Sequence, residues 1–396
     1  MPIVNRFAEF HDEIAAWRRD LHAHPELLFD VHRTAAFVKE KLAGFGVDEI
    51  VEGLGRTGVV GVIRGRGDTS GRVVGLRADM DALPIRELRD LPHKSAVDGL
   101  MHACGHDGHT AMLLGAAKYL AESRNFDGTA VVIFQPAEEG GGGAGVMVED
   151  GLMERFGIQQ VFGMHNRPGL PVGRFALRAG AQMASVDFFT IDIEGKGGHA
   201  ARPHLCVDPA IVVGQLIQGF QTVVSRSADP VESLVVSVTR IDMGTADNVI
   251  AQSARMGGTV RSLTPAMRDL AEARMNAICE HVGLANGAQV SFDYRRLYPV
   301  MANHAGEATF SASVARGIVG EGNVDDDVAP VMGGEDFAFM LEARPGALIF
   351  IGQGDTAALH HPEYDFNDEI IPLGCSYWVR LVETAMPAEP REGAGE

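Results

Sequence analysis

Cysteine is scarce in this chain of 396 residues, which contains only Cys104, Cys206, Cys279 and Cys375. So few thiols, so widely separated, exclude the disulfide framework of a small secreted protein and are typical of a reducing compartment. The first residues include acidic side chains where a secretory signal would be basic and then apolar. We therefore expect a cytoplasmic protein whose cysteines are candidate ligands or nucleophiles.

Long hydrophobic runs are also lacking, and basic residues are outnumbered by acidic ones. No stretch approaches the roughly 20 consecutive apolar residues that a membrane helix needs. The chain has 34 Lys and Arg against 53 Asp and Glu, which gives a formal net charge of -19. Negative charge repels phosphate backbones and anionic membrane surfaces, so we expect neither nucleic acid nor a membrane as a partner.

Two common hydrolase motifs are missing as well. The sequence contains no G-x-S-x-G and no H-E-x-x-H, which disfavours the usual serine hydrolases and the zincins. Residues 140–145, GGGGAG, match the dinucleotide template G-x-G-x-x-G, but Glu138 and Glu139 would repel a pyrophosphate there. We interpret these glycines instead as letting the backbone pass close to a substrate or a metal.

What the sequence does contain is an alternation of short apolar runs with helical patterns. Apolar runs occupy 58–63, 72–76, 130–134 and 161–164, and helical spacing occupies 110–121. Strands that alternate with helices predict an α/β domain with a mixed, mostly parallel sheet flanked by helices. In such sheets the chemistry gathers at the carboxyl ends of the strands.

The pattern changes between residues 185 and 294. The order of elements there is strand, helix, strand, strand, helix, strand, which is typical of a ferredoxin-like α+β domain. The predicted elements span 186–194, 210–225, 234–241, 254–262, 265–282 and 289–294. The α/β pattern then resumes, and the tail from Met386 is expected to fray. We therefore predict a discontinuous first domain, 1–184 and 295–396, with a second domain inserted at 185–294.

The densest group of candidate ligands is MHACGHDGH, residues 101–109. In an extended segment a thiolate and an imidazole two residues apart, Cys104 and His106, can point to the same side, as a metal ion requires. The alternatives are a polar surface loop and a reactive cysteine beside a histidine. Asp107 and His109 are expected to support this loop.

Further candidate ligands follow other predicted strands. Glu138 and Glu139 are adjacent and face opposite ways in an extended segment, so one carboxylate can bind a metal while the other meets a water. His165 ends another apolar run, where it is either a ligand or a hydrogen-bonded core histidine. Near the C-terminus, either His360 or His361 offers one more ligand.

Seven blocks of the sequence resemble, in order and spacing, the dinuclear metal-dependent amidohydrolases that include aminoacylase. The branch that the chain is most similar to contains hippurate hydrolase, N-acyl-amino-acid amidohydrolases and auxin-conjugate hydrolases. The blocks are LRADMDALPI (76–85), MHACGHDGH (101–109), FQPAEEG (134–140), MHN (164–166), GKGGHAARPH (195–204), GGEDF (333–337) and LHHPEYDFND (359–368). The resemblance implies a catalytic α/β domain interrupted by a ferredoxin-like lid or dimerisation domain.

The resemblance also assigns ligands and supporting residues by motif. It implies that the metal ligands are Cys104, His106, Glu139, His165 and His360. His360 is matched rather than His361 because the ligand follows the leucine in Leu-His-x-Pro. Glu138 matches the general base. Asp79 and Asp81 match an acidic block that orients ligand histidines through hydrogen bonds.

Relatives elsewhere in the superfamily usually have an aspartate where Cys104 stands, so its thiolate is expected to bridge two metals. Five ligands exceed the three of a single open catalytic zinc site, which favours two divalent ions per subunit. Zinc or manganese is expected, with cobalt and nickel as alternatives. We hypothesise that Glu139 and His360 complete one site, and His106 and His165 the other.

The resemblance places three residues of the inserted domain at the substrate. His199 is expected to reach the active site of the neighbouring subunit and to stabilise an oxyanion, which implies a homodimer formed through this domain. Asn248 and Arg261 match a block near the substrate, whose carboxylate needs a cation or aligned donors.

The sequence thus predicts a metal-dependent amidohydrolase that cleaves N-acyl-L-amino acids, either hippurate-like or N-acetyl substrates, into a carboxylic acid and a free amino acid. Glu138 is expected to take a proton from water and to return it to the departing amine. Two alternatives stay open. One is a dipeptidase or metallo-exopeptidase of the same fold, and the other is a metal-binding redox sensor that uses Cys104 without catalysis.

Overall fold

The computed structural model describes residues 5–389, and its contacts divide the chain into two compact units. One is built from Met1–Gly180, Ala302–Ala329 and Asp336–Glu396, and the other from Ala181–Met301 and Pro330–Glu335. We propose that the second unit is the inserted domain expected at 185–294. Within residues 5–389, none of the helices has both the length and the apolar character needed to span a bilayer.

The larger unit contains an eight-stranded mixed sheet in the order β1-β2-β4-β3-β5-β16-β6-β15. Strands β4, β3, β5 and β16 run parallel to one another, and antiparallel pairs flank them on both sides. This confirms the predicted mixed, mostly parallel sheet. The strands are β1 (Glu49–Leu54), β2 (Gly58–Arg64), β3 (Val73–Asp79), β4 (Thr129–Gln135), β5 (Gln160–Pro168), β6 (Phe175–Ala176), β15 (Val324–Asp325) and β16 (Gly346–Gly354).

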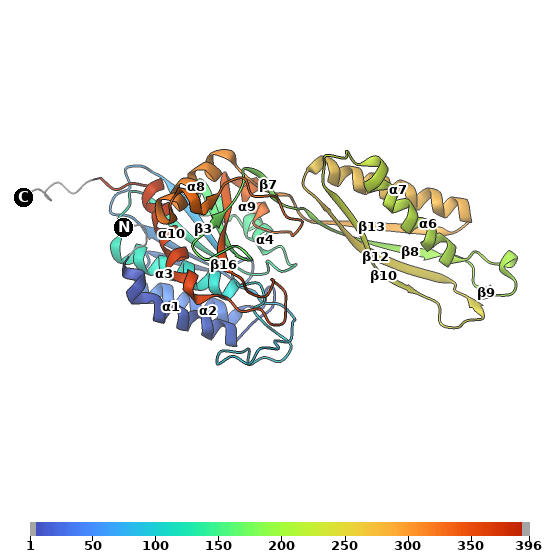
Figure 1. Cartoon of the computed structure of the whole chain (residues 1–396), viewed down its shortest axis with the longest axis horizontal. Helices are drawn as coiled ribbons and strands as arrows, with labels where there is room; N and C mark the ends of the chain where they lie inside the picture. Colours follow the sequence, from blue (N-terminus) through green and yellow to red (C-terminus); the bar gives the residue numbers. More distant parts are fainter. Residues whose placement is uncertain (1–4, 390–396) are drawn as a thin grey trace, which may run out of the picture. The chain divides into compact units, whose positions relative to one another are not determined.

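Helices flank this sheet because alternate residues of its central strands face opposite sides (Figure 1). In β3, Val74 and Leu76 join the core formed with α1, α2, α3, α8 and α10, whereas Arg77 points to the other side and lies over the ring of Phe337, next to α9. The helices are α1 (Arg6–Ala23), α2 (His32–Phe45), α3 (His106–Ser123), α4 (Gly143–Glu149), α5 (Leu152–Arg155), α8 (Ala305–Val319), α9 (Ala338–Ala343) and α10 (Ile371–Ala385).

The end of the described chain is more ordered than the sequence suggests. No element is predicted for 371–385, yet α10 packs there against α1, α3 and α8. Met386 is fully buried, and its carbonyl accepts a hydrogen bond from the Asp127 N–H (3.0 Å). The expected fraying is therefore wrong at Met386, because this apolar side chain extends the core beyond the helix. Residues 390–396 of the tail lie outside the described residues.

The smaller unit confirms the predicted ferredoxin-like order. Its four long strands form an antiparallel sheet in the order β10-β12-β8-β13. The two helices begin as their sequences indicate, because Asp208 and Thr264 cap them and a proline follows each cap. The elements are β8 (Val186–Glu194), β9 (Gly198–His199), α6 (Pro209–Thr222), β10 (Leu234–Met243), β11 (Val249–Ile250), β12 (Ser253–Ser262), α7 (Pro265–Asn286) and β13 (Gln289–Tyr298).

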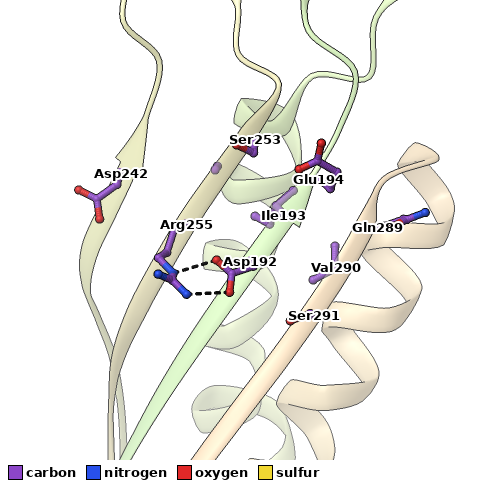
Figure 2. A pocket seen from close by; sticks show the side chains of 10 residues that line it. Asp192, Ile193, Glu194, Asp242, Ser253, Arg255, Gln289, Val290 and Ser291 are labelled. Atoms are coloured by element: carbon purple, nitrogen blue, oxygen red, sulfur yellow. Dashed lines mark hydrogen bonds and ion pairs between the residues drawn. The ribbon is translucent and has the colours of Figure 1, made fainter.

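One face of the small sheet is covered by its helices and the other is open, as Figure 2 shows. Asp192 stands on the open face and pairs with Arg255 (2.8 Å). Asp187 lies on the covered face and is fully buried, where it accepts hydrogen bonds from Arg268 Nε (2.9 Å) and the Tyr294 hydroxyl (2.7 Å). A buried carboxylate is tolerated only with such partners, so Asp187 fixes α7 against the sheet.

Candidate active site

Candidate ligands of the larger unit gather where its parallel strands end. The segments that follow β3, β4 and β16, the interior of β5 and the start of α3 come together at this edge of the sheet. These segments carry Asp79, Asp81, Cys104, His106, Glu138, Glu139, His165 and His360.

Two histidines face the thiol of Cys104. The ligand atoms of Cys104, His106 and His165 all lie within 4.8 Å of one another, and Cys104 Sγ is 3.5 Å from His165 Nε2. His106 Nδ1 donates to the carbonyl of Asp81 (2.8 Å), and His165 Nδ1 donates to the carbonyl of Asn166 (2.7 Å). Each bond fixes the ring and leaves Nε2 as its ligand atom.

Cys104 also belongs to a second group, with Glu139 and His360. The ligand atoms of these three residues lie within 4.8 Å of one another, and Glu139 Oε1 is 3.3 Å from His360 Nε2. The His360 N–H donates to the carbonyl of Ala103 (2.8 Å), and its φ of 63° lies in the left-handed region. A strained backbone of this kind persists only where its surroundings hold it. The thiol is thus common to two groups of three candidate ligands.

Glu138 lies beside these groups but shares no such group with Cys104 among the described residues. Its carboxylate is within 4.8 Å of ligand atoms of His106 and Glu139. The two carboxylate oxygens of Asp81 accept the backbone N–H groups of Glu138 (3.0 Å) and Glu139 (3.1 Å). Asp81 therefore holds both glutamates with its side chain and His106 with its carbonyl.

Two of the glycines after Glu139 are required by the fold of their own loop. A Cβ on Gly143 would lie 1.8 Å from the carbonyl oxygen of Pro136, and one on Gly141 would lie 2.6 Å from the Cβ of Ala137. Glycine is required at both positions because the loop folds back on its own strand end. Close approach to a substrate or metal is not needed to explain them.

His106 Nε2 is buried and has no hydrogen-bond partner within residues 5–389, and the buried Glu139 Oε1 has only the contact with His360 Nε2 at 3.3 Å. Unsatisfied buried polar atoms are costly and rare, and a cation would satisfy both. A thiolate, three imidazoles and a carboxylate are also donors that suit zinc and related transition metals. The residues present therefore fit divalent metal ions.

The charges around the site favour a cation for a second reason. Burial lowers the pKa of His106, but Asp79 and Asp81 outweigh burial and the pKa rises to about 10. Burial and the carboxylate of Glu139 raise the pKa of the Cys104 thiol well above its usual range. Without a cation, the surroundings of Cys104 thus favour the neutral thiol over the thiolate. A bound cation would stabilise the thiolate.

Asp79 supports the site differently from the expectation. One of its oxygens accepts from His109 Nδ1 (2.7 Å) and the other from Arg77 (2.7 Å), while His106 Nε2 lies 3.7 Å away. The hydrogen bond that Asp79 was expected to accept from a ligand histidine is not formed, because its oxygens turn toward Arg77 and His109 and leave His106 Nε2 3.7 Å away.

Two of the supporting residues were not assigned these roles from the sequence. His109 was expected only to support its loop, and Arg77 was missed. His109 links Asp79 to Asn166, whose side-chain oxygen lies 2.7 Å from His109 Nε2. Its signal is its position three residues after His106, on the same face of a helix. Arg77 is buried and pairs with Asp336 (3.0 Å). Its position in an otherwise apolar strand could have indicated its role, because a buried charge needs an oppositely charged partner.

The three candidates of the smaller unit do not lie together. His199 in β9 and Asn248, just before β11, are close because β9 pairs with β11. Both lie near the start of β12, whereas Arg261 lies near its end. A strand as long as Ser253–Ser262 spans roughly 30 Å. Arg261 is half-buried and has no ion-pair partner among the described residues.

Comparison with known proteins identifies the family. The model of peptidase family M20/M25/M40 matches residues 75–384. The chain is 41% identical to a hippurate hydrolase of Campylobacter jejuni, over 96% of this chain and 98% of that protein. It is 39% identical to thermostable carboxypeptidase 2 of Saccharolobus solfataricus, over 94% and 95%. A dinuclear metal binding peptidase of family M20 from Bacillus subtilis has the same fold, with a TM-score of 0.83, 37% identity and coverage of 96% and 99%.

These similarities cover nearly the whole chain and confirm the expected resemblance to metal-dependent amidohydrolases. The matched region includes every candidate ligand described above, from Cys104 to His360. The chain therefore belongs to peptidase family M20/M25/M40, and it is a metal-dependent amidohydrolase.

Proposed function

We propose that this chain hydrolyses the amide bond of N-acyl-L-amino acids, with hippurate-like or N-acetyl amino acids as substrates. The products are a carboxylic acid and a free amino acid. The observation that carries the proposal is the place of the Cys104 thiol, common to two candidate ligand groups whose members His106 and Glu139 adjoin the buried carboxylate of Glu138. The similarity to hippurate hydrolase supports the substrate class, because hippurate is an N-acyl amino acid.

In this proposal five residues would hold two divalent ions. His106 and His165 would bind one ion, Glu139 and His360 would bind the other, and Cys104 would contribute its thiolate to both. Zinc or manganese is favoured, with cobalt or nickel as alternatives, since thiolate and imidazole ligands suit zinc. When bound, such ions supply Lewis-acid polarisation of the amide carbonyl and of the attacking water.

Glu138 is the residue that moves the proton. It is buried and its backbone is held by Asp81, so its carboxylate is preorganised. Glu138 accepts a proton from the attacking water and donates it to the nitrogen of the departing amino acid.

Arg261 and Asn248 bind the carboxylate of the substrate. The half-buried guanidinium of Arg261 donates to the Thr259 hydroxyl and to the Val260 carbonyl, and it has no ion-pair partner among the described residues, so it can still receive an anion. Burial lowers the pKa of Arg261, and a carboxylate would offset that cost.

A homodimer formed through the smaller unit explains the separation of these residues. The roughly 30 Å length of β12 keeps His199 and Asn248 too far from Arg261 to touch one small substrate within a single chain. A second copy can supply the missing pair, and His199 of the partner subunit then donates a hydrogen bond to the developing oxyanion. The outer edge of β10 supports such a dimer, because among the described strands it has no further partner and it exposes Ile241 and Met243.

Mixing two inactive variants tests the shared site. Hybrid dimers of His199→Ala and Glu138→Gln chains contain one site with both native residues, so equal mixing should restore roughly a quarter of the wild-type activity. Activity is measured after mass spectrometry has verified subunit exchange. Exchanged but inactive hybrids would mean that each site is built from one chain.

Peptide hydrolysis is the second candidate function, favoured by the 39% identity to thermostable carboxypeptidase 2. It differs from the first in that the pocket would accept a free α-amine or a peptide in place of an acyl group. The redox-sensor alternative is disfavoured, because oxidants act on exposed thiols of low pKa and Cys104 is buried. Four free cysteines support the proposed cytoplasmic location.

A substrate panel decides between the two. The chain is stripped of metal by chelation, reloaded with each candidate ion, and assayed on acetyl, benzoyl, indoleacetyl and long-acyl amino acids and on simple dipeptides. We expect metal-restored hydrolysis of the acyl substrates and little hydrolysis of the dipeptides. Faster hydrolysis of dipeptides would favour the peptidase, and no metal-restored hydrolysis of either class would refute the proposed function.

A further inference from the structure

Helix α1 places two basic side chains one turn apart on one face, inside the larger unit. The side chain of Arg18 is 1% exposed and that of His22 is 0% exposed. Burying such groups is costly unless carboxylates pair with them. Their partners come from segments far away in the sequence, and these segments adjoin the candidate metal ligands.

Arg18 holds the segment that follows His360. Its Nε donates to Asp368 (2.7 Å), and one terminal nitrogen donates to Asp365 (3.2 Å). His93 adds to this cluster, with Nε2 3.1 Å from the same Asp365 oxygen. Arg18 therefore fixes the stretch after His360 to α1 by two ion pairs.

The same two side chains reach the residue after His106. Asp107 is buried, and one of its oxygens lies 2.9 Å from His22 Nδ1 and 3.6 Å from Arg18. The other ring nitrogen of His22 lies 3.4 Å from a Glu87 oxygen. The start of α3, which carries His106, is thus fixed to the same turn of α1.

We propose that Arg18 and His22 are positioning residues that set the distance between His360 and the segment that carries Cys104 and His106. The inference rests on the proposed function, since it concerns the two ligand groups that share Cys104. The two side chains act through carboxylates next to the ligands and are not ligands themselves.

Charge explains why Arg18 should matter most. Asp107, Asp365 and Asp368 all face its guanidinium, and without it these carboxylates would repel one another in a poorly solvated space. The segments that they belong to would then move apart. His360 is the ligand most exposed to this effect, because its side chain is 53% exposed and its backbone is strained.

The neighbouring residue provides a matched control. Arg19 donates to the other oxygen of Asp368 (2.9 Å), but its side chain is 54% exposed. Arg18→Met and Arg19→Met each remove one guanidinium bound to the same carboxylate, one buried and one at the surface. Arg18→Lys keeps the charge but loses the forked geometry.

The test is metal content and metal affinity of the full-length protein, measured by elemental analysis after dialysis and by zinc titration. We expect Arg18→Met to bind zinc about 10–100-fold more weakly and to keep close to one ion where the wild type keeps two. Its kcat for hippurate should fall more than its KM rises. Arg18→Lys should recover part of the loss, and Arg19→Met should match the wild type.

Two results would overturn the inference. One is a folded Arg18→Met protein with wild-type zinc affinity, and the other is an Arg19→Met protein that loses as much metal as Arg18→Met. If circular dichroism shows that Arg18→Met does not fold, Asp365→Asn replaces it, and unchanged zinc affinity in that folded variant overturns the inference as well. A wild-type chain that binds no divalent ion would instead refute the proposed function, and the inference with it.

Discussion

The Glu138→Gln variant should keep both metal ions and lose about 10²–10⁴-fold in kcat. Glutamine has the same size as glutamate, and the backbone N–H of residue 138 can still donate to Asp81 as it does in the native chain (3.0 Å). An amide oxygen cannot take up the proton of the attacking water. Because Glu138 shares no ligand group with Cys104 among the described residues, the metal-binding groups stay intact.

The measurement pairs elemental analysis with hydrolysis of hippurate. Glu149→Gln is the control, since Glu149 is an exposed residue at the end of α4 and should behave as the wild type. A metal-loaded Glu138→Gln protein with near-native kcat would assign the proton transfer to another group.

Cys104→Ala should lose both ions, whereas His360→Ala should lose only one. The difference follows from the structure, in which the Cys104 thiol belongs to both ligand groups and His360 to one. Removing a shared thiolate takes a ligand from each ion at once and leaves each with two. Hydrolysis by Cys104→Ala should fall to the level of the chelated wild-type protein.

A second buried cysteine serves as the control for this experiment. Cys375 lies in α10, where its thiol donates to the carbonyl of Met112 (3.2 Å), and its replacement by alanine should leave metal content unchanged. Metal content is counted per chain by elemental analysis after dialysis. Equal metal content in Cys104→Ala and His360→Ala would contradict a shared thiolate.

Local patterns predicted much of the fold. The strands β3, β4 and β5 each contain a run of apolar residues, and α6 and α7 start at capping residues followed by proline. Such signals lie within a few neighbouring residues, so a single sequence contains them. Helix α10 was missed although its buried face is apolar, and Met386 was taken for part of a frayed tail.

Contacts between distant segments were harder to predict. The candidate ligands could be proposed because the motifs of a known family fix them by position. The roles of Arg18, His22 and Arg77 depend on partners that are far away in the sequence. The sequence shows these basic residues, but no local pattern indicates which distant carboxylates pair with them. Their roles could therefore not be predicted. The same holds for Asp79. Its position near the candidate metal ligands was predicted, but its hydrogen bonds with Arg77 and His109 were not.

Anomalous X-ray diffraction can locate the two metal ions that we propose Cys104 bridges. Crystals of the zinc-loaded chain are measured at the zinc absorption edge. We predict two anomalous peaks, each about 2.3 Å from Cys104 Sγ, one beside His106 and His165 and the other beside Glu139 and His360. A single peak, or peaks that do not touch Cys104, would rule out a thiolate shared by two ions.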